Sequence, residues 1–563
     1  MYFRSFSQCS SLVQGRGQKS KNSITQTKLY NQARYSSPLS LAPATIKSSF
    51  KIETVKMCKL KILRASLVSI LALQLITSVI VNCDDDKCDD DLDDLRYELF
   101  ATKTIYGDAR AFLRKADDDE LPNSFDEDKL EKEHKELVKD GCVPLVFYFI
   151  GRHSARFPDA EDIEKYNKDL GELIGKMGST SGKCQRRRAE FFRWKSKMQA
   201  KHDNLITDLG GREEQDIARR FKRLYPEFFN AETADIEIGV TNKIRTAQTG
   251  AQFMRQVSGF NLPGCDERSV PTDDVDEQYY NLDKILEASC YRNMMDKFDK
   301  PFLAFHKQCE QISGEGKIKD PRIDRVKNPA LKKRIANRVA RKLGLDNRGD
   351  NPPVTPDVLE SIFDMCRFEN ALKNNSIWCN LFDKRDIEAL EYIEDVNSYI
   401  KSAYGPKANP RQSCPLVKDL VEAMQEGTNM TLGDGSKRKA YFYFSHADPI
   451  KKLLAAFEMF RDDDIISEKS ISAFERDLKV PRDRSWRTSV ITPFSANLAF
   501  ILYRCQKSRD KQATFKILAT VTEQPVKLGG CKDTDCSSRR FFDTYNSMRD
   551  CDLNQICRRR GAS

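Results

Sequence analysis

Two short segments of the chain combine histidine with charged residues at spacings that suit phosphate chemistry. Arg152, His153 and Arg156 lie in the first segment, and His446 and Asp448 lie in the second. Guanidinium groups bind phosphate oxygens through paired hydrogen bonds and stay charged at every working pH. An imidazole among them can attack phosphorus, and a carboxylic acid can protonate the leaving alcohol. The pattern predicts phosphoryl transfer through a covalent phosphohistidine.

A structural role is the alternative for the first segment, with Arg152 and Arg156 in salt bridges and His153 in the core. That interpretation must also explain a second histidine followed by an acid, in a chain with only 5 His. The repeated pattern favours the functional interpretation. No pair of cysteines is separated by two residues and the histidines are scattered, so the sequence does not favour a zinc site.

The elements that hold these segments are predicted strands. Residues 143–150 form an unbroken apolar run, and residues 439–444 form a second aromatic-rich run. Each run ends shortly before its histidine. Ligand sites of open α/β sheets lie at the carboxyl ends of strands, so we expect His153 and His446 to face the same crevice.

The wider pattern indicates an α/β fold with a mostly parallel sheet flanked by helices and an inserted, smaller all-α domain. The α/β domain is predicted over 139–261 and 405–557, and the helical insertion over 262–404. The predicted strands are 143–150, 236–240, 439–444, 497–505 and 516–521. The predicted helices are 161–176, 213–223, 245–257, 284–294, 329–343, 358–372, 385–404 and 450–460.

The net charge of +10 comes from the amino-terminal region of the chain. Residues 1–56 are basic, polar and predicted to be a disordered upstream extension. Residues 57–83 resemble a secretory signal peptide or an uncleaved signal anchor, with Met57 as an alternative start. Residues 1–83 hold 12 Lys/Arg and one acid, which leaves about −1 for the remainder. Near neutrality argues against a nucleic-acid partner.

The cysteines are consistent with an oxidising compartment. The chain has 17 Cys, of which 14 follow the signal segment. We expect several disulfides, with Cys290/Cys309, Cys366/Cys379, Cys531/Cys536 and Cys551/Cys557 as plausible local pairs. Possible glycosylation acceptors are Asn374 and Asn429. The predicted location is the secretory pathway or outside the cell, with a membrane-anchored or lysosomal protein as the alternative. Residues 84–138 are predicted to be an acidic lead and linker.

The segment 152–158 resembles the RHGxRxP motif of histidine acid phosphatases, and 446–448 resembles the HAE motif of their multiple inositol polyphosphate phosphatase branch. Supporting stretches are 206–213, 241–246, 493–505 and the tail 521–557. The resemblance covers about 140–557. It implies an α/β fold with a helical insertion, no metal or other cofactor, and a small polyanionic phosphate ester as the partner. The implied substrates are inositol polyphosphates, including inositol hexakisphosphate, and 2,3-bisphosphoglycerate.

The resemblance also implies a role for each site residue. His153 would be the nucleophile, and Asp448 would be the proton donor. Arg152, Arg156, Arg245 and His446 would bind the substrate phosphate.

Two residues depart from the family pattern, because Ser154 stands for Gly and Asp448 for Glu. A side chain at 154 would strain the loop if the position needs a positive φ. The leading hypothesis is a secreted phosphomonoesterase of the phytase type. A broad-specificity acid phosphatase and a catalytically impaired polyphosphate-binding protein are the alternatives. A membrane contact is expected only if the signal segment is retained, and the sequence indicates no oligomeric state.

Two basic clusters have two interpretations each. Residues 317–342 contain eleven Lys/Arg, and a second cluster runs from Arg186 to Lys197. Either cluster could steer a polyphosphate or contact a distal phosphate. Either could equally be a solvated helix face.

Overall fold

The computed structural model describes residues 99–115, 128–178, 185–262, 289–309, 318–373, 375–430, 433, 436–506 and 512–557. The predicted upstream extension and signal segment lie outside these residues. No helix in the described part of the chain is long and apolar enough to cross a membrane.

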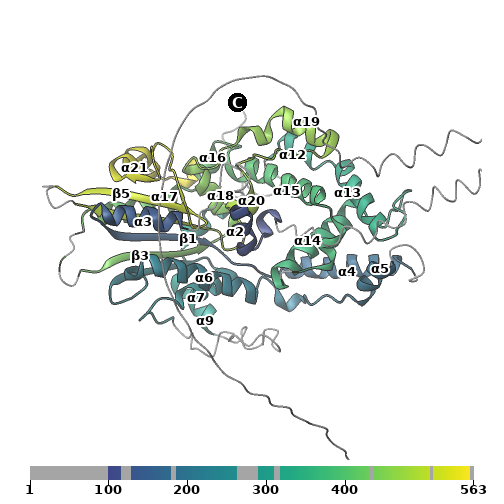
Figure 1. Cartoon of the computed structure of the whole chain (residues 1–563), viewed down its shortest axis with the longest axis horizontal. Helices are drawn as coiled ribbons and strands as arrows, with labels where there is room; N and C mark the ends of the chain where they lie inside the picture. Colours follow the sequence, from purple (N-terminus) through teal and green to yellow (C-terminus); the bar gives the residue numbers. More distant parts are fainter. Residues whose placement is uncertain are drawn as a thin grey trace, which may run out of the picture. The chain divides into compact units, whose positions relative to one another are not determined.

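A seven-stranded sheet forms the centre of the fold (Figure 1). Its path is β2-β3-β1-β4-β5-β6, and β7 pairs with β5. The strands are β1 (Cys142–Arg152), β2 (Ala234–Val240), β3 (Arg438–Ser445), β4 (Asn497–Cys505), β5 (Thr514–Val521), β6 (Gln524–Val526) and β7 (Asp535–Ser537). Each of the five predicted strands falls within an observed one, which confirms the α/β class with a central sheet flanked by helices.

The expectation of a mostly parallel sheet was wrong. Only β2–β3 and β3–β1 are parallel, whereas β1–β4, β4–β5, β5–β6 and β5–β7 are antiparallel. The connections explain one part of the difference, the antiparallel pairing of β4 with β5. Long helical segments separate β1, β2 and β3, but only residues 506–513 join β4 to β5. A short connection reverses the chain, and parallel strands need a long crossover.

Both faces of β1 are buried, which explains its unbroken apolar run. Phe147 and Phe149 pack on one face against Phe221 and Phe253, which lie on α6 and α7. Alternate residues such as Tyr148 belong to the core on the other face. Figure 1 shows α6, α7 and α9 on one side of the sheet and α17, α18 and α21 on the other. Helices on both faces require apolar residues at successive positions.

The helices that cover the sheet are α2 (Tyr106–Lys115), α3 (Lys129–Lys139), α6 (Asp208–Leu224), α7 (Ile244–Met254), α9 (Ser289–Phe298), α17 (Cys414–Thr428), α18 (Ala447–Ala456), α20 (Thr488–Ile491), α21 (Ser538–Tyr545) and α22 (Leu553–Cys557). Two further helices, α4 (Ala160–Lys176) and α5 (Gln185–Arg193), follow β1. Within the segment predicted as a lead and linker, Phe100 and Tyr106 are buried, so residues 99–115 contribute to the core.

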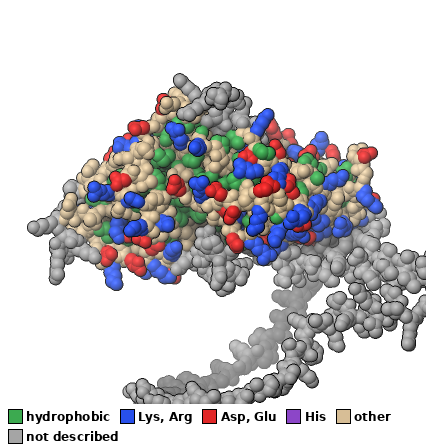
Figure 2. All heavy atoms as spheres, turned by 90° about the horizontal axis from the view of Figure 1, so that it is seen from above, with side chains coloured by type: hydrophobic (Ala, Val, Ile, Leu, Met, Phe, Trp, Pro, Cys, Tyr) green, Lys and Arg blue, Asp and Glu red, His purple; other side chains and the backbone are tan. Residues whose placement is uncertain are grey.

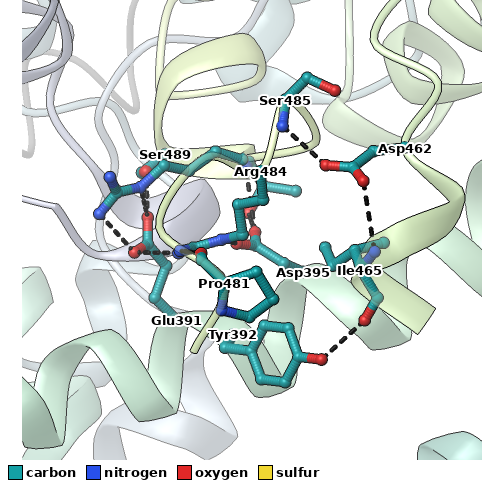
Figure 3. Close-up of polar contacts among 11 residues, drawn as sticks. Glu391, Tyr392, Asp395, Asp462, Ile465, Pro481, Arg484, Ser485 and Ser489 are labelled. Atoms are coloured by element: carbon teal, nitrogen blue, oxygen red, sulfur yellow. Dashed lines mark hydrogen bonds and ion pairs between the residues drawn. The ribbon is translucent and has the colours of Figure 1, made fainter. Parts of the chain in front are cut away.

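The described part of the predicted insertion, residues 289–309 and 318–404, contains helices and no strand. Its main helices are α10 (Phe305–Gln308), α12 (Pro321–Val326), α13 (Pro329–Lys342), α14 (Pro356–Lys373) and α15 (Lys384–Ser398), and a π-helical turn, η9 (Tyr399–Ala403), follows α15. Then come α16 (Ala408–Arg411) and, after β3 and α18, α19 (Glu468–Asp477). Figure 3 shows α15 joined to the loop before α20 by buried ion pairs between Glu391, Asp395 and Arg484.

Two of the predicted local disulfides are present, Cys366–Cys379 and Cys531–Cys536. The other two predictions were wrong, because Cys309 pairs with Cys557 and Cys551 pairs with Cys414. A further bridge joins Cys142 to Cys505 on the adjacent strands β1 and β4. Three of these five bridges close long stretches of chain, which sequence spacing cannot reveal.

Candidate active site

The two predicted histidines lie side by side because their strands do. Arg152 ends β1 and is in register with Ser445 at the end of β3. The backbone N–H of His153 donates to the carbonyl of Ser445 at 3.0 Å, and the two imidazole centroids are 5.6 Å apart. Both histidines are buried. The structure therefore places His153 and His446 next to each other, at the carboxyl ends of two adjacent parallel strands.

The neighbouring strand β2 brings in the third part of the site. Val240, its last residue, is in register with Phe444 of β3, and Thr241 follows directly. The hydroxyl of Thr241 lies 3.0 Å from Nε2 of His446. Four residues further on, at the start of α7, Arg245 donates from Nη1 to Oδ1 of Asn204 at 2.8 Å.

The tautomer of His153 follows from one hydrogen bond. Its Nδ1 lies 3.1 Å from the carbonyl oxygen of Ser154. A carbonyl only accepts, so Nδ1 carries the proton and Nε2 of the neutral ring keeps a lone pair. Burial, followed by the charges of Arg152 and Arg245, holds the pKa of His153 well below its usual value. The lowered pKa favours the neutral imidazole, which is the form that can act as a nucleophile.

The three predicted arginines have mainly neutral partners. Arg152 donates from Nη1 to the carbonyls of Thr102 at 2.5 Å and Thr492 at 2.9 Å, and Arg156 donates to the carbonyl of Phe157 at 2.7 Å. Arg156 is also 3.8 Å from the half-exposed carboxylate of Asp159.

Arg152 is buried, Arg156 and Arg245 are partly buried, and the proximity of these cations lowers the pKa of Arg152 and Arg245. Burial, followed by the charge of Arg156, lowers the pKa of Arg152 to about 9 and that of Arg245 to about 10. The Nε atoms of all three arginines are buried without a hydrogen-bond partner among the described residues. Such donors are costly unless they are satisfied, so the cluster is suited to an anion with several oxygens.

The loop before β4 closes another side of the site. The ring of Phe494 lies 4.5 Å from the guanidinium carbon of Arg152, and the N–H of Ser495 donates to the carbonyl of His153 at 3.3 Å. Ser495 adopts a left-handed backbone with φ of 57°. Strained backbone of this kind costs energy and tends to occur at functional sites.

The predicted proton donor has two ammonium neighbours on its own helix. Nζ of Lys452 is 2.9 Å from Oδ2 of Asp448, and Nζ of Lys451 is 3.8 Å from Oδ1. Burial would raise the pKa of Asp448, but the charges of Lys452 and then Lys451 outweigh it and hold the pKa well below its usual range. The carboxylate is ionised in the ligand-free protein.

Ser154 fits its position without strain. It is fully buried and is not among the described residues with a positive φ. Its N–H donates to the hydroxyl of Thr249 at 3.0 Å, and its own hydroxyl lies 3.2 Å from the same oxygen. The side chain therefore points to α7, and the concern raised by the missing glycine does not apply.

Several site residues were not predicted. Lys451 and Lys452 lie three and four residues after Asp448, a spacing that places all three on one helix face and could have been recognised. No motif indicated His306, whose ring centroid is 6.1 Å from that of His446, and whose Nδ1 is buried with no hydrogen-bond partner among the residues that the structure describes. Burial lowers the pKa of Lys103, beside Thr102, to about 8, and the charges of Arg367 and Arg156 add to this effect.

Several basic side chains of the segment 317–342 form ion pairs with carboxylates of the protein itself. Arg325 pairs with Glu468 at 2.7 Å and Glu475 at 2.6 Å, Lys342 pairs with Asp383 at 2.5 Å, and Lys332 and Arg338 pair with Glu360 and Asp386. In Figure 2, Lys and Arg side chains on the face shown are accordingly interspersed with Asp and Glu. In the second cluster, Arg188 is buried, and the side chains of residues 185–187 lie outside the described ones.

The comparisons with known proteins agree with this geometry. A curated relative, multiple inositol polyphosphate phosphatase 1 of Gallus gallus, is 24% identical over 419 residues and covers 74% of this chain and 84% of its own. The Homo sapiens protein of the same name is 22% identical over 434 residues, covering 75% and 83%. Phytase A of Aspergillus oryzae is 21% identical over 432 residues, covering 73% and 83%.

A solved structure has the same fold. The phytase from D. castellii superposes with a TM-score of 0.52 at 15% identity and covers 75% of this chain and 83% of its own. The sequence profile of the histidine phosphatase superfamily (branch 2) matches residues 148–520, which include every predicted site residue. The resemblance predicted from the two motifs is confirmed, and the chain belongs to the histidine phosphatase superfamily, branch 2.

Proposed function

We propose that this protein removes phosphate groups from inositol polyphosphates through a phosphohistidine on His153. The observation that carries the proposal is the neutral, buried imidazole of His153, with its Nε2 lone pair available and three arginines around it. Relatives named as inositol polyphosphate phosphatases match across about three quarters of the chain. Inositol hexakisphosphate is the first substrate to test, followed by 2,3-bisphosphoglycerate.

In the first step, Nε2 of His153 attacks phosphorus while the bond to the leaving oxygen breaks. Arg152, Arg156, Arg245 and His446 bind the phosphoryl oxygens and stabilise the negative charge of the transition state. The leaving oxygen takes a proton from Asp448. In the second step, Asp448 takes a proton from water as the water attacks the phosphohistidine, which releases phosphate and restores His153.

Asp448 must gain a proton before the first step, although two lysines keep it ionised in the ligand-free protein. Binding of a polyanion raises the pKa of Asp448, because the negative charge of the polyanion opposes the positive charges of Lys451 and Lys452. The donor is therefore expected to become protonated together with substrate binding.

Phosphate release from inositol hexakisphosphate and from p-nitrophenyl phosphate tests the proposal, using the wild type and His153→Ala. A preference for the polyphosphate that His153→Ala abolishes supports it. Comparable rates on both substrates would favour a broad-specificity acid phosphatase. Tight binding of the polyphosphate by the wild type with no release would favour a binding protein.

We also infer that the protein passes through the secretory pathway. The five disulfides of the described residues support this inference, because such bonds persist in oxidising compartments. Amino-terminal sequencing of the protein recovered from the medium tests it and distinguishes a cleaved signal from a retained anchor.

A further inference from the structure

A second group of cations lines a hollow between α12 and the π-helical turn η9. The hollow has a volume of about 410 Å³, and its charged lining residues are Lys319, Asp320, Asp324, Lys327 and Lys401. It is formed entirely by segments that lie between β2 and β3 in the sequence. π-helical turns are rare and are frequently found at functional sites.

The positive charges of the hollow exceed its available negative charges. Arg322 binds the carboxylate of Asp320 in a bidentate pair at 2.9 and 2.6 Å, which neutralises that acid. The lining then holds the ammonium groups of Lys319, Lys327 and Lys401 and one remaining carboxylate, that of Asp324. Burial and then the charge of Lys401 lower the pKa of Lys327, while Glu394 and Glu360 oppose this shift. Two cations that repel each other across a cavity are stabilised by an anion placed between them.

One residue of the π-helical turn connects the hollow to Asp448, the proposed proton donor. Ser402 follows Lys401 in the π-helical turn, and its hydroxyl hydrogen-bonds to Asp448. Glu394 acts electrostatically on both places, because its charge influences Lys327 of the hollow and Lys451 beside Asp448. An anion in the hollow would therefore lie one residue of the π-helical turn away from a contact of Asp448, at a place lined by none of the residues predicted to bind phosphate at His153.

We propose that Lys327 and Lys401 form a second phosphoryl-binding site, for a phosphate group that is not the one being hydrolysed. The group is either a distal phosphate of the bound substrate or free inorganic phosphate. The first possibility rests on the proposed function, and the second does not. We assign the two lysines a role in binding this second phosphate and no role at the reacting atoms.

Two measurements on Lys327→Met/Lys401→Met distinguish the sources, with Lys333→Met as the control. Lys333 is an exposed lysine on the neighbouring helix α13. The first measurement is the ratio of kcat/KM for inositol hexakisphosphate to kcat/KM for p-nitrophenyl phosphate, which has a single phosphate. We expect this ratio to fall about tenfold in the double variant, as for the loss of a charged hydrogen bond. The ratio should not change in the control.

The second measurement is calorimetric titration of the wild type and both variants with inorganic phosphate. A second bound phosphate that the double variant loses identifies free phosphate as the ligand. A change in the substrate ratio alone identifies a distal phosphate. No change in either measurement, or an equal change in Lys333→Met, overturns the proposal. If the wild type hydrolyses neither substrate, the proposed function fails, and the titration alone then decides the proposal.

The melting temperature separates a binding role from a structural one. Because the two lysines repel each other in the ligand-free protein, Lys401→Met alone should leave the melting temperature unchanged or raise it slightly. A clear fall in melting temperature would show that Lys401 stabilises the fold, and this outcome also contradicts the proposal.

Discussion

Two places in the molecule bury arginines among charged residues, and they differ in what the arginines bind. Beside α15, Arg484 donates to Glu391 at 2.7 Å and to Asp395 at 2.9 Å, and Arg487 donates to Glu391 at 2.8 Å (Figure 3). Both carboxylates are completely buried. At the candidate active site, Arg152, Arg156 and Arg245 instead donate to carbonyl and amide oxygens, and the half-exposed carboxylate of Asp159 lies 3.8 Å from Arg156.

The difference separates a charge cluster that supports the fold from one that, under the proposed function, binds the substrate. Beside α15, the protein supplies the counter-charges, so the cluster is complete in the folded chain. At the active site, three arginine Nε atoms are buried without partners among the described residues. Repulsion among these arginines destabilises the ligand-free site, and under the proposed function an anionic substrate would relieve that repulsion. Such a conflict between function and stability is common at functional sites.

Removing Arg484 should have the largest effect on stability. Arg484→Met leaves Glu391 and Asp395 buried with less positive charge, and we expect the free energy of unfolding to fall by about 3–5 kcal/mol. Urea denaturation measures this. Arg461→Met is the matched control, because the Arg461–Asp463 pair is exposed and its loss should cost less than about 0.5 kcal/mol. Equal losses in the two variants would contradict the structural role of the buried cluster.

Removing Arg245 should lower activity without lowering stability, which is the opposite of the effect expected for Arg484→Met. We expect Arg245→Met to lower kcat/KM for inositol hexakisphosphate by about 10²–10³-fold, as for the loss of a preorganised transition-state donor. Its melting temperature should stay the same or rise, because the variant relieves repulsion from Arg156. A variant that loses stability but retains kcat/KM would show that the comparison between the two arginine clusters is wrong.

Substitution of Lys452 tests whether the neighbouring positive charge controls the pKa of Asp448, the proposed proton donor. Because Lys452 lowers the pKa of Asp448, Lys452→Met should raise that pKa. A larger fraction of Asp448 is then protonated at each pH, so the alkaline limb of the kcat profile should move upward by about one pH unit. Lys439→Met, which removes an exposed pair with Glu426, should leave the profile in place. An unmoved limb in both variants would exclude Asp448 as the group that titrates there.

Ser154→Gly should have the smallest effect. The serine side chain points to Thr249 and the position has no positive φ, so the family glycine is not needed for backbone conformation. We expect kcat/KM to change by less than about threefold, within the range of a neutral hydrogen bond. A much larger gain in steady-state rate would show that Ser154 hinders the substrate.

The strands, the α/β class and the adjacency of the two histidine segments could be predicted from the sequence, because these depend on local pattern. The apolar runs before His153 and His446 are signals of buried strands, and parallel pairing of β1 and β3 brings the two histidines together. Tertiary contacts determined what could not be predicted. β4 runs antiparallel to β1 after the long helical segment 446–496, a direction that no local pattern indicates. His306 lies beside His446 although 140 residues separate them, and Cys309 pairs with Cys557 across 248 residues.

The most direct test of the account is to trap the covalent intermediate. The wild type and His153→Ala are mixed with radiolabelled inositol hexakisphosphate and quenched within the first turnover, and the labelled peptide is sequenced. The account predicts an acid-labile, alkali-stable label on His153 of the wild type, none in His153→Ala, and a fall in kcat on the order of 10⁴-fold or more in that variant. Label on another residue, or release of phosphate by His153→Ala at the wild-type rate, would contradict it.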